Sequence, residues 1–281
     1  MPTPSPSDEI ARLAAAVDRS ASRPDAAPPP VRPTGYLAVT RTPTVGFLAA
    51  LPLFVLYEVG VIAANGGAAA QVRVGADVWL KTLLAWFGVG GWAALGGVVL
   101  LVGIGVFVAE RTRRPVLVPA YFGGIVAESL VYALVLAALV GGAVGALFGG
   151  ALWPAGPPMA LMAQGAVPGG LGMQLALSIG AGLYEELVFR VILVGGLAYA
   201  LRRAAGLTAG RALVAAALVG AVVFSAVHHV GPYGDPFALD VFTFRFLFGL
   251  ALNGVFLVRG FALAAWTHAL YDVLVVSGWF A

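Results

Sequence analysis

The stretch "GLGMQLALSIGAGLYEELVFRVILVGGLAYAL", residues 170–201, decides how this chain folds. It is long and apolar enough to form a helix that crosses a bilayer, which takes about 20 residues. Near its middle, however, "YEELVFR" (184–190) places two glutamates and an arginine in seven residues. Ionisable groups are costly inside a membrane, so their presence there indicates a pairing or a functional role.

The composition of the whole chain agrees with this stretch. Of the 281 residues, 60% are hydrophobic and 10% are charged, and the mean hydropathy is +0.95. Soluble domains carry about 25% charged residues, so we predict an all-α, polytopic membrane protein with the lipid bilayer as its partner. The chain has no cysteine, which excludes disulfides and a thiol nucleophile. It also shows no basic patch of the kind that binds nucleic acid.

Apolar runs predict about seven transmembrane helices. They cover residues 43–64, 84–109, 116–150 in part, 170–201, 212–230, 238–258 and 261–280. The third run is too long for one upright helix. It either tilts or folds back at its Gly-rich end, residues 143–150, which would add an eighth crossing. Residues 76–83 are either a helix at the membrane interface or the start of a longer second span.

Three regions follow from these spans. Residues 1–42 are predicted to be a disordered tail rich in Pro and Ala. Residues 43–169 hold the first transmembrane helices and end in an uncharged loop, 151–169. Residues 170–281 form a transmembrane core that carries the polar motifs.

The basic residues between the spans predict the orientation. Those that fall on one side are Arg12, Arg19, Arg23, Arg32, Arg41, Arg111, Arg113, Arg114, Arg202, Arg203, Arg211 and Arg259. The other side has Arg73, Lys81 and Arg245. The positive-inside rule therefore predicts a multi-pass protein of the cell membrane with a cytoplasmic N-terminus.

Few ionisable groups remain inside the predicted spans. They are Glu58, Glu128, Glu185, Glu186, Arg190, His228, His229, His268 and Asp272. Most of them lie in the fourth, fifth and seventh spans, which would allow a single polar site. Glu58 and Glu128 are isolated in the sequence, so each either pairs with a donor from elsewhere or is neutral. His229 points about 100° away from His228, and we expect it at the membrane surface.

Helical spacing sorts the remaining groups. Glu186 and Arg190 are four residues apart and can pair on one face, which favours a structural role. Glu185 is rotated by about 100° from its neighbour and is free for another partner. His268 and Asp272 are also four apart. A carboxylate near an imidazole can activate water as a general base, and a second polar pair opposite can stabilise an oxyanion.

Three motifs in these spans carry a family resemblance. "EELVFR" (185–190) fits the pattern EExxxR, "FSAVH" (224–228) fits FxxxH, and "HALYD" (268–272) fits HxxxN/D. In this order, over about residues 170–280, they resemble the CPBP family. That family includes the type II CAAX prenyl endopeptidases and the related bacteriocin-processing and immunity proteins.

The resemblance implies an intramembrane endopeptidase of the glutamate type, with no cofactor and no metal. It implies that Glu185 and His228 activate the attacking water and that Glu186 and Arg190 support the first glutamate. The substrate would be a membrane-associated peptide or protein. Whether that substrate is prenylated, and the oligomeric state of the protein, are left open.

The resemblance also implies that His268 and Asp272 form the oxyanion site. The prenyl-protease branch typically ends the last motif in Asn, whereas this chain has Asp272. An ionised Asp cannot donate a hydrogen bond to an oxyanion. Asp272 is therefore either protonated or orients His268.

Other functions remain open from the sequence. A zinc-dependent membrane protease could draw on the same His and Glu residues, although HExxH is absent. A serine protease is disfavoured because neither Ser129 nor Ser225 lies in a GxSxG setting. A non-catalytic immunity protein or a proton-coupled transporter would also carry buried carboxylates.

The depth of the site is a further open point. Glu185 lies 17 residues before Arg202, roughly 25 Å along a helix. His268 lies nine residues after Arg259, roughly 14 Å. The two depths disagree unless helices are tilted, offset or broken.

Overall fold

The computed structural model describes residues 32–66, 72–90, 92–111, 115–149, 170–231 and 234–280, together with Arg12. It divides the chain into two units, Met1–Arg32 and Pro33–Ala281, and the helices below belong to the second. The predicted tail up to residue 31 and the predicted loop 151–169 lie outside the described residues, with the exception of Arg12.

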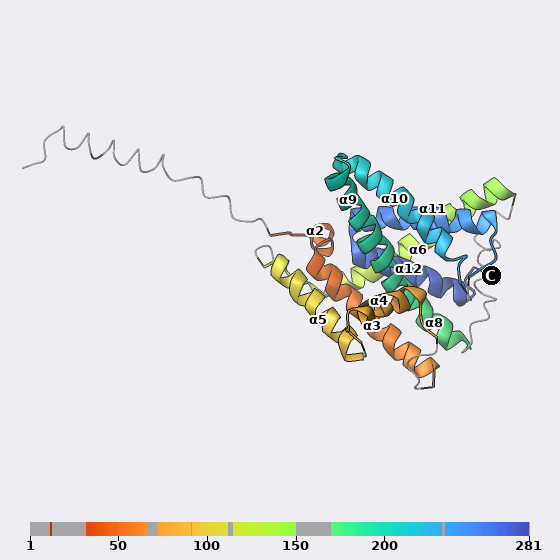
Figure 1. Cartoon of the computed structure of the whole chain (residues 1–281), viewed down its shortest axis with the longest axis horizontal. Helices are drawn as coiled ribbons and strands as arrows, with labels where there is room; N and C mark the ends of the chain where they lie inside the picture. Colours follow the sequence, from red (N-terminus) through yellow and green to blue (C-terminus); the bar gives the residue numbers. More distant parts are fainter. Residues whose placement is uncertain are drawn as a thin grey trace, which may run out of the picture. The chain divides into compact units, whose positions relative to one another are not determined.

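The regular structure of the described residues is helical throughout (Figure 1). The elements are α2 (Tyr36–Thr40), α3 (Pro43–Ala64), α4 (Gly75–Trp86), α5 (Trp92–Ala109), α6 (Pro119–Phe148), α8 (Gly170–Gly180), the π-helices η1 (Ala181–Glu185) and η2 (Leu187–Gly195), α9 (Gly196–Ala204), α10 (Ala209–Val227), α11 (Leu239–Arg259) and α12 (Phe261–Val276). The predicted all-α class is therefore confirmed.

Several of these helices are suited to a membrane. Within the described ranges, α3, α6, α10 and α11 are the four helices that are long and apolar enough to cross a bilayer. Two shorter apolar helices, Gly96–Ala109 within α5 and Phe261–Val276, accompany them. The chain is thus a polytopic membrane protein, and the number of seven crossings stays a prediction.

The second predicted span, 84–109, is wrong at its start. Helix α4 ends at Trp86, and Gly88 follows with a φ of +76°, a left-handed conformation that favours glycine and stops a helix. Helix α5 begins anew at Trp92. Residues 76–83 therefore belong to a separate helix and do not begin a longer span.

The third predicted span does not fold back. Helix α6 runs unbroken for 30 residues and ends where Gly149 adopts a left-handed φ of +72°. Its Ala133 and Ala137 are fully buried and let other helices approach closely. At 1.5 Å per residue the helix is about 45 Å long, against a hydrocarbon thickness of about 30 Å. A tilted or protruding helix that continues to Phe148 accommodates the long run.

The helix α12 lies at the centre of the bundle. It packs against α3, α6, α8, η1 and α11, and its residues Ala264 and Ala265 are fully buried. Small side chains on α12 permit this close approach on several sides. Gly260, with a φ of +94°, joins α11 to α12 in a tight turn, so the two helices run antiparallel.

Helices η1 and α12 approach each other closely at Gly182, where the neighbouring atoms include the backbone of α12. A Cβ atom at this position would lie 2.5 Å from the carbonyl oxygen of Ala265 and 2.5 Å from the amide nitrogen of Ala269. Backbone atoms cannot yield as a flexible side chain can. Only glycine lets the two helices meet at this distance.

We expect Gly182→Ala to lower the free energy of unfolding by about 1–3 kcal/mol, because overpacking forces η1 away from α12. The measurement is thermal unfolding of the purified protein in detergent. Gly196→Ala is the matched control, since a Cβ there meets nothing within 4 Å in the same helical path. The control should raise stability slightly, as Ala replaces Gly in a helix. Equal melting of both variants would contradict the tight contact.

Two carboxylates that looked isolated in the sequence, Glu128 and Glu58, are paired. Glu128 accepts hydrogen bonds from Tyr36 Oη at 2.6 Å and from Tyr132 Oη at 2.6 Å, and Arg259 Nε lies 2.6 Å from it. Arg259 also donates to Thr40 Oγ1 at 3.0 Å. Donors from three segments distant in the chain therefore satisfy one carboxylate.

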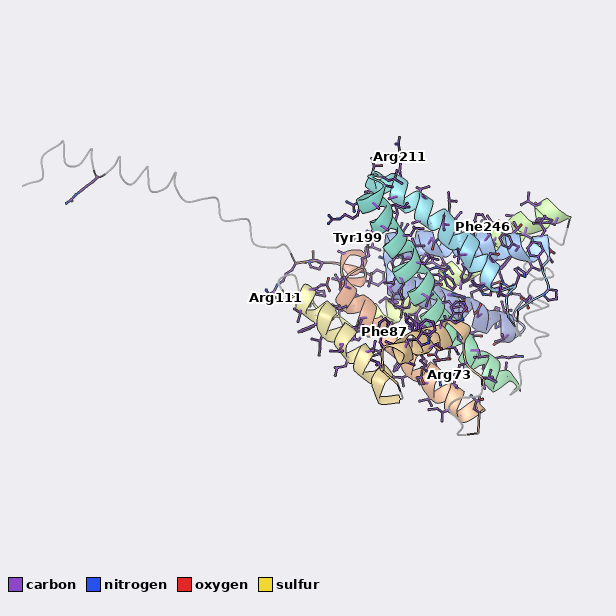
Figure 2. All side chains as sticks on the ribbon, viewed as in Figure 1. Arg73, Phe87, Arg111, Tyr199, Arg211 and Phe246 are labelled. Carbon is purple, nitrogen blue, oxygen red and sulfur yellow. The ribbon has the colours of Figure 1, made fainter. Side chains whose placement is uncertain are left out.

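This cluster corrects two predictions. Arg259 is only 5% exposed, so it is a buried partner of Glu128 and not a cation of a loop. Residues 36–40 form α2 and contact this cluster, so ordered structure begins before the predicted tail boundary at residue 42. Figure 2 shows Arg111 beyond the end of α5 and Arg211 near the start of α10, and both side chains are exposed.

The other isolated carboxylate, Glu58, joins α3 to α4. Arg73 NH2 lies 2.5 Å from Glu58 Oε1 and Arg73 Nε lies 2.5 Å from Asp77 Oδ2, while Lys81 Nζ lies 2.8 Å from Asp77 Oδ1. Burial disfavours the charge on Arg73, but the hydrogen bonds to Asp77 and Glu58 outweigh it, so the pKa of Arg73 is raised. Tyr184 Oη donates to Glu58 at 3.3 Å, which connects this network to the EExxxR motif.

Candidate active site

The EExxxR residues lie where the fourth predicted span widens. Glu185 ends η1, Glu186 lies between the two π-helices, and Arg190 lies in η2. The sequence predicted an ordinary α-helix here, and the structure corrects this. A π-helix holds more residues per turn, so neighbouring side chains are separated by a smaller rotation than the about 100° of an α-helix. Both glutamates can therefore face the interior of the bundle.

The second glutamate, Glu186, holds two partners. Its Oε2 lies 3.0 Å from Arg190 Nε, the pair that the i, i+4 spacing predicts, and both side chains are essentially unexposed. Its Oε1 lies 2.8 Å from His268 Nδ1 on α12. The second contact was not predicted. Glu186 therefore ties the first motif to the last one.

The first glutamate, Glu185, faces His228 just beyond the end of α10. Glu185 Oε2 lies 3.6 Å from His228 Nε2, too far for a direct hydrogen bond. His228 Nδ1 lies 2.7 Å from the carbonyl oxygen of Phe224, so this nitrogen carries the hydrogen and Nε2 of the neutral ring is an acceptor. Two acceptors thus face each other, and Glu185 Oε2 is buried without a hydrogen-bond partner.

The phenylalanine of the second motif packs the two imidazoles together. The ring of Phe224 lies edge-on to His228 at 4.8 Å and to His268 at 6.0 Å between centroids. Arg190 lies over the same ring at 4.4 Å from its centroid. Cation–π and aromatic contacts of this kind fix side-chain orientation in an apolar setting. Phe224 is therefore the common wall of the site.

The last motif residue, Asp272, lies beside His268. Its Oδ2 is 3.5 Å from His268 Nε2, longer than an ordinary hydrogen bond. His268 thus has one carboxylate on each side of the ring, with Glu186 at Nδ1 and Asp272 at Nε2. All six predicted site residues, from three separate helical segments, are brought together.

Several other candidates lie apart from this constellation. His229 turns to the following loop, where its Nδ1 is 3.1 Å from the carbonyl oxygen of Asp235. Ser225 Oγ donates to the carbonyl oxygen of Phe242 at 2.7 Å, and Ser129 Oγ donates to that of Leu263 at 3.3 Å. Both hydroxyls are thus bound to backbone. Among the described residues, no group of three or more His, Asp or Glu side chains is arranged to hold a metal ion.

Sequence reasoning missed one charged residue at this site. Arg245 was assigned to a membrane-flanking position, but it lies on α11, is 6% exposed and pairs with Asp235. It is close enough to Glu185, His228 and Asp272 to interact with each of them electrostatically. Its position inside the sixth apolar run is the signal that would have placed it among the intramembrane ionisable groups.

The contact between the first and last motifs bears on the difference in predicted depth. Glu186 contacts His268, so the two helices present their polar groups at one level. The π-helical path also puts more residues in each turn between Glu185 and Arg202, which shortens the distance that they span.

Comparison with known proteins gives a match for the C-terminal part of the chain. A family model described as "Type II CAAX prenyl endopeptidase Rce1-like" matches residues 168–274. No curated protein and no solved structure matches the chain. The matched segment contains the three motifs and the whole constellation of η1, η2, α10, α11 and α12 described above. Residues 168–274 are thus similar to the Rce1-like type II CAAX prenyl endopeptidases, and this similarity supports an intramembrane protease of the CPBP family.

Proposed function

We propose that this protein is a glutamate-type intramembrane endopeptidase in which Glu185 and His228 activate the attacking water. The observation that carries the proposal is the pair of acceptors, Glu185 Oε2 and His228 Nε2, 3.6 Å apart. A water molecule donates two hydrogen bonds, so one water can bind both acceptors at once. The side chains are 16% and 21% exposed, which leaves a path for water and peptide.

The chemistry proceeds by proton transfers at these atoms. Glu185 takes a proton from the water as the oxygen attacks the peptide carbonyl carbon, and the carbonyl π electrons move to its oxygen. The resulting oxyanion is stabilised on the side of His268 and Asp272. The C–N bond then breaks, and Glu185 returns the proton to the leaving amine. Each proton that Glu185 accepts is thereby released again.

The buried members of the constellation support this step. Glu186 accepts from His268 Nδ1 and pairs with Arg190, so it holds the imidazole in a fixed orientation. Neither Glu186 nor Arg190 is exposed, which suits positioning better than contact with substrate. This division matches the one that the family resemblance implies.

The membrane setting of the proposal follows from the apolar helices and the basic residues. The substrate is a peptide or protein segment held in or at the bilayer. We place the protein in the cell membrane with its N-terminus in the cytoplasm, because exposed arginines such as Arg111 and Arg211 follow the positive-inside pattern.

The test is peptide cleavage by the purified protein in liposomes. The panel contains a prenylated CAAX peptide and several membrane-spanning peptides, and mass spectrometry identifies the products. We expect cleavage of at least one peptide that continues after treatment with a chelator. Cleavage lost with chelator and restored by zinc would instead indicate a metalloprotease. Binding of the panel peptides without cleavage of any would favour a non-catalytic member of the family.

A further inference from the structure

The oxyanion side of the site lacks an obvious second donor. His268 donates from Nδ1 to Glu186, so its Nε2 can donate as well only when the ring is an imidazolium, and Asp272 beside it is a carboxylic acid where an amide would donate. An ionised carboxylate there repels the negative charge that develops on the carbonyl oxygen. A site that stabilises an oxyanion beside Asp272 needs a cation or a donor from another helix.

Arg245 is placed to fill this role. Helices α11 and α12 run antiparallel, and the ring of Phe248 on α11 lies 5.9 Å from His268 and 4.3 Å from Tyr271. Arg245 is three residues before Phe248, about one turn back along α11. Asp272 is about one turn forward from His268 along α12. Arg245 and Asp272 therefore lie at the same level on facing helices.

The guanidinium of Arg245 is only partly satisfied. One guanidinium nitrogen, Nη2, pairs with Asp235, whereas the other, Nη1, is buried and has no hydrogen-bond partner. The side chain is 7% exposed. A buried donor without an acceptor is costly, so such a group in a native fold calls for an explanation. One explanation is that the acceptor of this donor is present only during the reaction.

The Arg245–Asp235 pair also fixes Arg245 relative to His228, which faces the proposed base Glu185. The amide nitrogen of Asp235 donates to the carbonyl oxygen of His228 at 2.8 Å. Asp235 therefore contacts two residues of the site: its backbone binds His228, and its carboxylate binds Arg245. A guanidinium that is fixed in this way can act without reorganising during the reaction.

We propose that Arg245 is a catalytic residue that donates a hydrogen bond from Nη1 to the oxyanion of the tetrahedral intermediate. It would take the place of the amide donor that an Asn at position 272 would supply. No atom is transferred in this step. The guanidinium balances the charge that appears when the carbonyl electrons move to oxygen, and the pair with Asp235 holds it in place. The inference rests on the proposed endopeptidase function.

The experiment is a double-mutant cycle with Arg245→Gln and Asp272→Asn, using a quenched prenylated CAAX peptide in liposomes. We expect Arg245→Gln to lower kcat about 10²–10³-fold with little change in KM, the cost of removing one oxyanion donor. In the Asp272→Asn background, where the amide can donate, the loss should be at least tenfold smaller. A merely structural arginine would not be rescued by an amide at position 272.

Arg245→Lys and Asp235→Asn separate the remaining explanations. The lysine variant keeps a cation and should retain more activity than the glutamine variant, even if the latter melts early. Because Asp235 fixes Arg245, Asp235→Asn should lower kcat by no more than Arg245→Gln does. A larger loss that Asp272→Asn does not relieve would assign the effect to the backbone contact of Asp235 with His228 and would overturn the proposal. An Arg245→Gln loss of the same size in both backgrounds, or within threefold of wild type, would also overturn it. The comparison requires two controls in the same assay: the wild type must cleave the peptide, and Glu185→Gln must not. If the wild type does not cleave, the proposed endopeptidase function has failed, and the role of Arg245 is a separate question.

Discussion

Replacing Glu185 by Gln should abolish peptide cleavage while the protein remains folded. The amide cannot take a proton from water, and general-base catalysis contributes about 10²–10⁴-fold to the rate. We therefore expect kcat to fall by at least about 10³-fold with KM little changed. The substitution is nearly isosteric, and Glu185 makes no direct hydrogen bond through Oε2 that would be lost. Steady-state kinetics on the liposome assay is the measurement.

Glu110→Gln is the matched control for this change. Glu110 lies beyond the end of α5 and accepts a hydrogen bond from the amide nitrogen of Thr44 at 2.7 Å, which a glutamine oxygen can also accept. The control should cleave like wild type, and both variants should melt like wild type. Measurable cleavage by Glu185→Gln at more than a tenth of the wild-type rate would remove Glu185 from the role of base.

Replacing Arg190 by Met should cause the largest loss of stability. The change leaves Glu186 as a buried carboxylate with His268 as its remaining partner, and it removes the cation from the face of Phe224. Breaking one side of a buried ion pair costs about 3–5 kcal/mol. The measurement is the free energy of unfolding in a detergent titration. Arg211→Met is the matched control, because Arg211 is exposed at the start of α10.

A second substitution makes this prediction sharper. Glu186→Gln added to Arg190→Met removes the uncompensated charge, so the double variant should be more stable than Arg190→Met alone. Both variants should lose activity. In Arg190→Met, Glu186 loses the arginine that fixes it, so it no longer holds His268 in one orientation. In the double variant, His268 faces a neutral amide in place of its carboxylate partner. A double variant less stable than the single one would show that the contact of Arg190 with Phe224, and not its charge, holds the site.

The local patterns of the sequence carried much of the site. Apolar runs of spanning length predicted the membrane class, and the i, i+4 spacing predicted the Glu186–Arg190 pair. The three motifs singled out six residues that the fold gathers. These predictions succeed because helical periodicity is a property of neighbouring residues, which a sequence displays directly.

Contacts between distant segments were beyond such reasoning. The sequence alone determined that this is an all-α membrane protein with most of its intramembrane ionisable groups in the fourth, fifth and seventh predicted spans. Only the tertiary structure decided that Glu186 binds His268, 82 residues away, and that Arg245 lies at the same level as Asp272. It also decided where the helix widens around Glu185. These features are set by packing between helices. Small residues such as Gly182 decide which helices meet and at what height, because they let two backbones approach closely. The periodicity of residues along one helix does not specify the neighbouring helix.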